Sequence, residues 1–159
     1  MKNNKKLSLW ELYLTKEIGI EFKACLYFFA ILFYYCMFKL CTGSASASIL
    51  HMAEMIFTAY IIGYIQVYLF NNFDEAENLG LREWVGILVC TCIYLTVAFF
   101  GKWFDGNMYV LLGFAAYLLL TYFCVFLIYR SKRRIDDRKL NEDLKLFQAS
   151  HKKVSDEGK

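Results

Sequence analysis

The sequence has no proline, and charged residues are scarce in four long stretches. Without proline, the proline-broken half-helices that many transporters use as ion sites are absent, although glycine could still interrupt a helix. The first twenty residues lack the apolar segment and small-residue cleavage site of a signal peptide, so we expect the first apolar stretch to be kept as an anchor. The chain also has no nucleophile–base pair, phosphate-binding glycine loop or redox motif, which disfavours an enzyme.

The chain instead contains long apolar stretches, and hydrophobic residues make up 58% of it. They are concentrated in four stretches, at residues 22–40, 49–70, 84–100 and 108–129. Each stretch is close to the ~20 residues that a helix needs to cross ~30 Å of hydrocarbon. The stretches are apolar nearly all round, whereas a helix of a soluble protein keeps a charged face. The sequence therefore predicts an all-α integral membrane protein.

Short connections between the stretches predict that consecutive helices are antiparallel neighbours, so residues 22–129 should form a four-helix transmembrane bundle. Lysine and arginine are frequent in residues 1–21 and 130–159, whereas the connection 42–48 has none. The connection 101–107 has only Lys102. Because basic residues near span ends favour the cytoplasm, we expect a multi-pass protein of the plasma membrane with both termini cytoplasmic.

The segments outside the bundle also show helix signals. Ser8 and Glu11 have the spacing of a capping box, and Trp10 and Tyr13 suit the headgroup level, so we expect a short interfacial helix before the first span. After the fourth span, the basic cytoplasmic tail 130–159 should continue as an amphipathic helix to about Phe147. The polar composition of the final dozen residues predicts disorder there.

The tail carries the candidate residues for contact with a partner or with lipid. Four apolar residues should fall in one broad stripe among charged neighbours: Ile135, Leu140, Leu144 and Phe147. The basic members are Arg130, Lys132, Arg133 and Arg134. A basic run directly against a membrane is typical of attraction to anionic lipid, so we expect no direct contact with nucleic acid.

Six cysteines lie within or at the ends of the spans, where thiols usually act as small apolar fillers, so we expect no disulfide framework. The connection 42–48 consists of small residues and predicts a tight hairpin in which Ser46 or Ser48 caps the second span. No cofactor is expected, and a metal site is disfavoured because His51 and Glu54 supply only two ligands.

The second span holds the candidate intramembrane polar site. His51, Glu54 and Thr58 lie within about 60° of one another on a helix, and Gln66 lies on the adjoining arc with Ala59 and Gly63. Four aromatic residues occupy the opposite arc: Phe57, Tyr60, Tyr64 and Tyr68. We expect the polar and small side to face the bundle and the aromatic side to face lipid.

Glu54 is the most informative residue of this span, because an unpaired carboxylate inside a membrane is costly. Lys39 at the end of the first span and Lys102 after the third are the candidate partners. Two interpretations stand. Glu54 and His51 form either a ligand- or proton-sensing site, or a structural pair that fixes the register of the helices.

The layout resembles an uncharacterised family of small four-span bacterial membrane proteins. The resemblance covers most of residues 22–147: four short crossings, a polar second span that begins Ile49-Leu-His-Met-Ala-Glu54, and a basic cytoplasmic helix. Members of that family are commonly encoded beside LytTR-type transcription regulators, and some act as membrane-bound antagonists of them. The resemblance assigns no functional residues.

The resemblance implies that this chain regulates a cytoplasmic partner, as the membrane-bound antagonist of a LytTR-type transcription regulator. The alternative from the residues alone is a small transporter or an export or resistance subunit, in which Glu54 couples to protons. A third hypothesis is a purely structural accessory subunit. The partners we consider are the lipid bilayer, a cytoplasmic transcription regulator and a second copy of the chain.

Overall fold

A computed structural model describes residues 9–44, 46–70, 72–73, 76 and 79–157. All the regular elements in those ranges are helices: α1 (Leu9–Cys41), α2 (Ile49–Tyr64), the π-helix η1 (Ile65–Leu69), α3 (Leu81–Phe100) and α4 (Met108–Glu157). The described residues contain four helical segments long and apolar enough to cross a membrane, at Lys16–Cys41, Ile49–Leu69, Leu81–Phe100 and Met108–Gln148. The prediction of an all-α chain with four apolar helices is confirmed.

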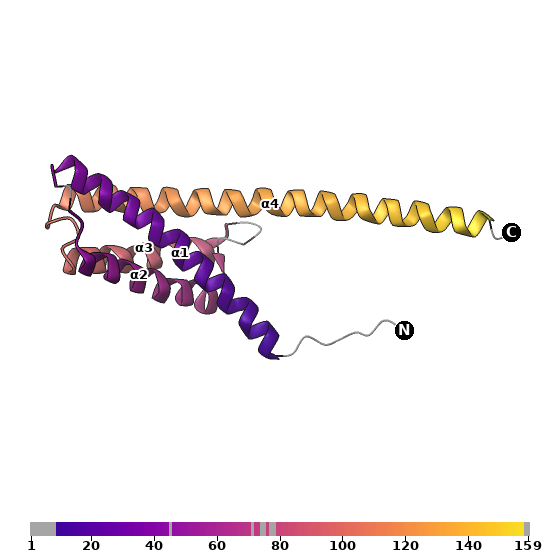
Figure 1. Cartoon of the computed structure of the whole chain (residues 1–159), viewed down its shortest axis with the longest axis horizontal. Helices are drawn as coiled ribbons and strands as arrows, with labels where there is room; N and C mark the ends of the chain where they lie inside the picture. Colours follow the sequence, from indigo (N-terminus) through magenta and orange to yellow (C-terminus); the bar gives the residue numbers. More distant parts are fainter. Residues whose placement is uncertain (1–8, 45, 71, 74–75, 77–78, 158–159) are drawn as a thin grey trace.

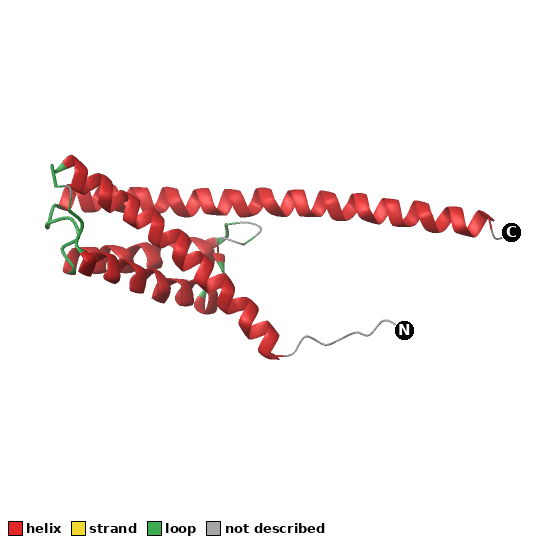
Figure 2. Ribbon diagram, viewed as in Figure 1, coloured by secondary structure: helices red, strands yellow, loops and turns green. Residues whose placement is uncertain are grey.

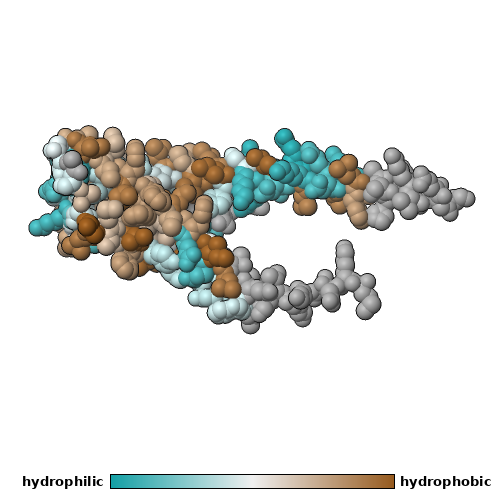
Figure 3. All heavy atoms as spheres, viewed as in Figure 1, coloured by the Kyte–Doolittle hydropathy of each residue, from teal (hydrophilic) through white to brown (hydrophobic). Residues whose placement is uncertain are grey.

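α2, α3 and α4 run back and forth roughly along one direction, and α1 crosses them obliquely (Figure 1, Figure 2). The connections 42–48 and 101–107 lie at one end, which we call the hairpin end. The connection 71–80 and both chain termini lie toward the other end, which we call the termini end. α4 continues far past the other helices, and its visible surface there is mostly hydrophilic, whereas the visible surface of the bundle is mostly hydrophobic (Figure 3).

Large aromatic side chains build the core between the helices. The rings of Tyr27 on α1 and Tyr122 on α4 lie 4.9 Å apart, and Phe73 from the connection lies 5.4 Å from the same Tyr122 ring. All three side chains are buried. Two hydroxyls also join α1 to α4, since Tyr34 donates to Val110 O at 3.0 Å and Tyr117 donates to Ala30 O at 3.0 Å. Buried tyrosines of this kind combine packing area with a directed hydrogen bond.

The interfacial helix expected before the first span is not a separate element, because α1 is one uninterrupted helix of 33 residues. Trp10 and Tyr13 stack on its exposed N-terminal part, with ring centroids 5.9 Å apart. The predicted capping residue Ser8 lies outside the described residues. The apolar part and the N-terminal part of α1 therefore form one continuous helix.

The tail also differs from its prediction. α4 remains helical to Glu157, whereas the predicted helix ends at about Phe147. The physical reason is that an established helix extends at little cost per residue, and neither proline nor glycine interrupts the chain before Gly158. The polar composition of the segment leaves it without an apolar core to pack on but does not terminate the helix.

Only part of the expectation for the cysteines is confirmed. All six thiols are free, so the prediction that they form no disulfide framework holds. Cys90 is buried and packs in the core as a small filler. Four others lie exposed on helix surfaces: Cys25, Cys41, Cys92 and Cys124. The filler interpretation is wrong for these four, because their side chains are exposed rather than packed in the core.

A glycine on α3 permits the connection 71–80 to pack closely. A Cβ at Gly86 would lie 2.9 Å from Phe73 Cδ1 and 3.0 Å from Phe70 Cγ. Both contacts are with rigid rings, and Phe73 is itself buried between helices. The absence of a side chain at Gly86 therefore sets how near the connection lies to α3.

We predict that Gly86→Ala lowers the free energy of unfolding by about 1–3 kcal/mol, the usual cost of overpacking a core. Gly19→Ala is the matched control, since its Cβ would meet nothing within 4 Å. It should be neutral or stabilising by up to about 1 kcal/mol, because alanine favours a helix. Thermal unfolding of the purified protein in detergent measures both. Equal changes in the two variants would contradict the packing argument.

Candidate functional site

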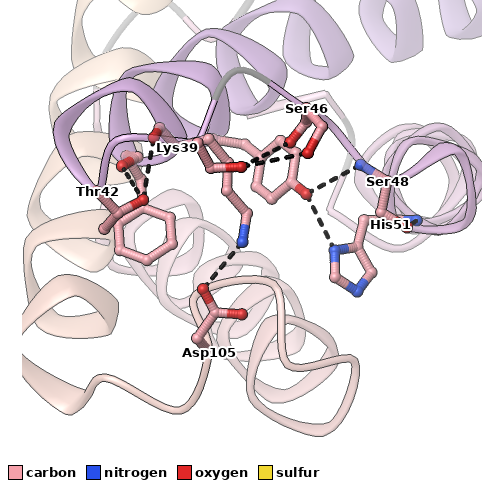
Figure 4. Close-up of polar contacts among 9 residues, drawn as sticks. Lys39, Thr42, Ser46, Ser48, His51 and Asp105 are labelled. Carbon is pink, nitrogen blue, oxygen red and sulfur yellow. Dashed lines mark hydrogen bonds and ion pairs between the residues drawn. The ribbon is translucent and has the colours of Figure 1, made fainter.

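The start of α2 is held by a hydroxyl from α1. Ser48 is the N-cap residue, and its Oγ accepts from the His51 amide at 3.4 Å, which confirms one of the two predicted caps. The Tyr35 hydroxyl accepts from the Ser48 amide at 3.3 Å and lies 3.2 Å from His51 Nδ1 (Figure 4). Ser46 instead contacts Ser44. The His51 imidazole is thereby fixed against α1 and directed at a tyrosine.

Lys39 does not reach Glu54. Its Nζ lies 2.9 Å from Asp105 Oδ2, across the hairpin end between α1 and the connection 101–107 (Figure 4). The same ammonium lies 5.4 Å from the centre of the Phe38 ring. Asp105 remains 65% exposed, so water screens this ion pair and its net contribution is small. The prediction that Lys39 pairs with Glu54 is wrong, because the Lys39 ammonium pairs with Asp105 instead.

Glu54 is paired with an indole. Trp103 Nε1 donates to Glu54 Oε2 at 2.8 Å, and the Trp103 side chain is fully buried. Lys102, the other predicted partner, is exposed. The cause is the backbone turn after α3: Lys102 has a φ of 52°, which directs Trp103 back into the bundle. A buried tryptophan needs an acceptor for its single N–H, but the sequence alone does not show that Trp103 rather than Lys102 is the buried residue.

The contact between Glu54 and Trp103 depends on the absence of a side chain at Gly101. A Cβ there would lie 2.8 Å from Glu54 Oε2 and 2.8 Å from Trp103 Nε1. The Glu54 carboxylate, the Trp103 indole and the backbone at Gly101, the C-cap of α3, thus pack closely against one another. This geometry joins the N-terminal part of α2 to the connection that follows α3.

The remaining polar side chains of the second span take no part in the contact between Glu54 and Trp103. Thr58 is buried and its hydroxyl donates to Glu54 O at 2.6 Å, within its own helix. His51 contacts Tyr35 while Glu54 contacts Trp103, so the two residues have separate partners. This arrangement favours the structural interpretation, in which each residue fixes the register of α2 against one neighbour.

Gln66 lies in η1 and is fully buried. Within the described part of the chain, neither of its amide side-chain atoms has a hydrogen-bond partner. The backbone carbonyl oxygen of Gln66 accepts from the backbone amide of Asn72 at 3.0 Å, and this bond closes the end of the helix. A short π-helix of this kind widens the helix locally and often accompanies functional positions.

The orientation of the second span is confirmed on its polar side. Ala59 and Gly63 are buried together with Thr58 and Gln66. On the aromatic side, Phe57 and Tyr68 are exposed as expected. Two aromatic residues instead face α1: the Tyr60 hydroxyl donates to Glu21 Oε1 at 3.2 Å, and the Tyr64 hydroxyl donates to Glu17. The expectation that these two face lipid is wrong, because the acidic residues of α1 supply acceptors there.

A buried cation that was not predicted from the sequence lies at the termini end. Lys23 on α1 is only 2% exposed. Its ammonium donates to Asn72 Oδ1 and lies 5.5 Å from the centre of the Tyr129 ring on α4. The signal was the lysine at the start of the first apolar stretch, since a buried ammonium requires acceptors or an aromatic face. Lys23 therefore joins α1, the connection 71–80 and α4.

The tail residues project from the bundle on the last part of α4. All the candidates are exposed except Arg133, which is half-buried: Arg130, Lys132, Arg133, Arg134, Ile135, Leu140, Leu144 and Phe147. Leu140, Leu144 and Phe147 lie within about 60° of one another, whereas Ile135 lies about 140° from Leu140. The apolar stripe is therefore narrower than predicted and does not include Ile135.

Comparisons with known proteins yield no match to this chain among family models, curated proteins or solved structures.

We predict that Glu54→Leu lowers the free energy of unfolding by about 1–3 kcal/mol, because the buried Trp103 N–H loses its acceptor. Glu54→Gln keeps an oxygen at the same place and should cost clearly less. Replacing both partners, Glu54→Leu with Trp103→Phe, should cost less than the sum of the two single changes. Thermal unfolding in detergent measures this double-mutant cycle. Strictly additive effects would show that the two side chains are not coupled.

Proposed function

We propose that this chain is a multi-pass plasma-membrane protein that regulates a cytoplasmic protein partner and holds it at the membrane. Four apolar helices supply the crossings. Both termini lie toward one end of the bundle, and the basic residues concentrated near them favour the cytoplasm for that end. In this orientation the hairpin end faces outward, and the extension of α4 projects into the cytoplasm.

The observation that carries the proposal is this extension, which is helical to Glu157 and has none of the other described helices beside it (Figure 1). Leu140, Leu144 and Phe147 form an exposed apolar stripe on it, flanked by charged residues. A helix with an apolar stripe at this spacing is the common form in which a helix binds a groove on a partner. Three large apolar side chains exposed to water are otherwise costly.

The resemblance to four-span proteins encoded beside LytTR-type transcription regulators suggests the class of partner. A regulator bound to the extension would be kept at the membrane and away from its DNA. A change in the bundle could release it, because α4 is a single helix from the hairpin end to the extension. The chain would then act as a membrane-bound antagonist.

The test is capture of a coexpressed LytTR-type regulator, encoded beside the gene, by the full-length protein. We expect that replacing Leu140, Leu144 and Phe147 with serine lowers capture at least about tenfold, since loss of each buried interface side chain costs on the order of 1–2 kcal/mol. The matched control replaces Ile135 and Leu146, which are equally exposed but lie on another face of α4. Capture that survives removal of residues 132–159 would contradict a role for the extension.

The second candidate function is proton-coupled transport, and the half-buried Glu54 carboxylate is the observation that favours it. This function predicts pH-dependent substrate flux in reconstituted vesicles that is lost in Glu54→Gln, because the amide cannot release a proton. The variant retains an acceptor for Trp103, so folding should persist and can be checked by thermal unfolding. Unchanged flux in a folded Glu54→Gln protein would exclude Glu54 as the coupling residue.

A further inference from the structure

An open groove lies between α1 and α4 where the two helices leave the bundle at the termini end. Its volume is about 540 Å³. Ile18 and Phe22 of α1 line one side. Tyr129, Lys132, Arg133 and Asp136 of α4 line the other side. The groove thus combines an apolar wall, an aromatic ring and two cations beside one acidic residue.

We propose that this groove binds one anionic glycerophospholipid. The lipid phosphate lies at Lys132 and Arg133, and the acyl chains lie along Ile18 and Phe22. The inference rests on the membrane placement of the proposed function but does not depend on any protein partner. It assigns a defined lipid site to one face of the basic run, in place of a diffuse attraction along the whole run.

The position of the groove fits the headgroup region. Tyr129 ends the apolar part of α4, and the basic run follows immediately after it. Aromatic rings are enriched at this level of a membrane, and basic pockets between helices on the cytoplasmic side bind anionic headgroups. Lys132 can lay its methylene stem on the apolar wall while its ammonium reaches the phosphate.

The apolar wall distinguishes a lipid from a soluble phosphate compound. Ile18 is 66% exposed and Phe22 is 60% exposed, so both offer apolar surface that a free phosphate would leave uncovered. Acyl chains cover such surface at the point where the helices enter the bilayer. The two kinds of group in the groove thus correspond to the two parts of one phospholipid.

The lipid would also contact Tyr129, whose ring lies beside the buried cation Lys23. Tyr129 lines the groove, and its ring lies 5.5 Å from Lys23 Nζ. Lys23 in turn donates to Asn72 of the connection 71–80. An occupied groove would therefore brace α1 against α4 at the base of the extension, next to the contact that joins three elements of the bundle.

The experiment is native mass spectrometry of the full-length protein in detergent, titrated with phosphatidylglycerol or phosphatidylcholine. We expect one phosphatidylglycerol to bind in preference to phosphatidylcholine. Lys132→Gln should weaken its binding by about fivefold, the effect of one basic residue near an anionic lipid. The matched control Arg134→Gln removes one positive charge two residues away, about 160° around the helix, and should change binding by less than about twofold.

Two further variants test the groove itself. Phe22→Ala should weaken binding, whereas Phe29→Ala, equally exposed and about 20° away around α1, should not. Gly19→Leu places a side chain where a Cβ meets nothing within 4 Å, so it should fill the groove without disturbing the helix and reduce binding while both cations remain.

Equal losses in Lys132→Gln and Arg134→Gln would overturn the proposal in favour of diffuse attraction to the basic run. Displacement of the lipid by millimolar inorganic phosphate or glycerol phosphate would identify a free-phosphate site instead. The measurement contains no regulator, so its failure is separate from failure of regulator capture. Mapping that placed the termini on opposite sides of a membrane would remove the proposed topology whatever the lipid result.

Discussion

The structure depends on one constraint: a polar group that lies among apolar helices is costly unless it has a partner inside the protein, and several such groups have partners that join helices. Tyr34 and Tyr117 meet it by donating to carbonyl oxygens across the contact between α1 and α4. Trp103 meets it by donating to Glu54, and Lys23 meets it with Asn72 and the face of Tyr129. Each of these contacts joins two elements that apolar packing alone would leave free to slide. The polar groups therefore set the register of helices whose apolar surfaces are otherwise interchangeable.

Hydropathy along the sequence was sufficient to predict the four helices, because helix length and apolar composition are local properties. The buried side of α2 could be predicted for the same reason, since residues three and four apart share a face. The contacts of Tyr60 and Tyr64 with acidic residues of α1 could not. The partner of Glu54 could not. Lys102 and Trp103 are adjacent in sequence, and the left-handed backbone at Lys102 decides which of them enters the bundle. That backbone conformation is set by the packing of the whole connection and has no signature in the residues themselves.

Lys23 is a second case in which the sequence does not identify the partners of a charged residue. A charge count treats it as one more basic residue near the first span, although it is buried in the structure. What makes burial tolerable is distant in sequence: Asn72 adopts a φ of 64° in the connection 71–80, and Tyr129 lies on the last helix. The position of a buried charge is therefore a property of the tertiary arrangement. Its presence in an apolar stretch can be read from sequence, but its partners cannot.

The two ends of the bundle differ in whether the candidate residues are paired within the chain or exposed. At the hairpin end, Lys39 is paired with Asp105, and Glu54 and His51 each have a partner within the chain. At the termini end, the groove beside Lys132 and the stripe of Leu140, Leu144 and Phe147 remain exposed, one directly after the other along α4. Because α4 is one continuous helix, a change in how α1 packs against its base would alter the direction of the whole extension. The groove and the stripe thus lie on one helix, so a change in the packing of α1 against α4 would move both of them together.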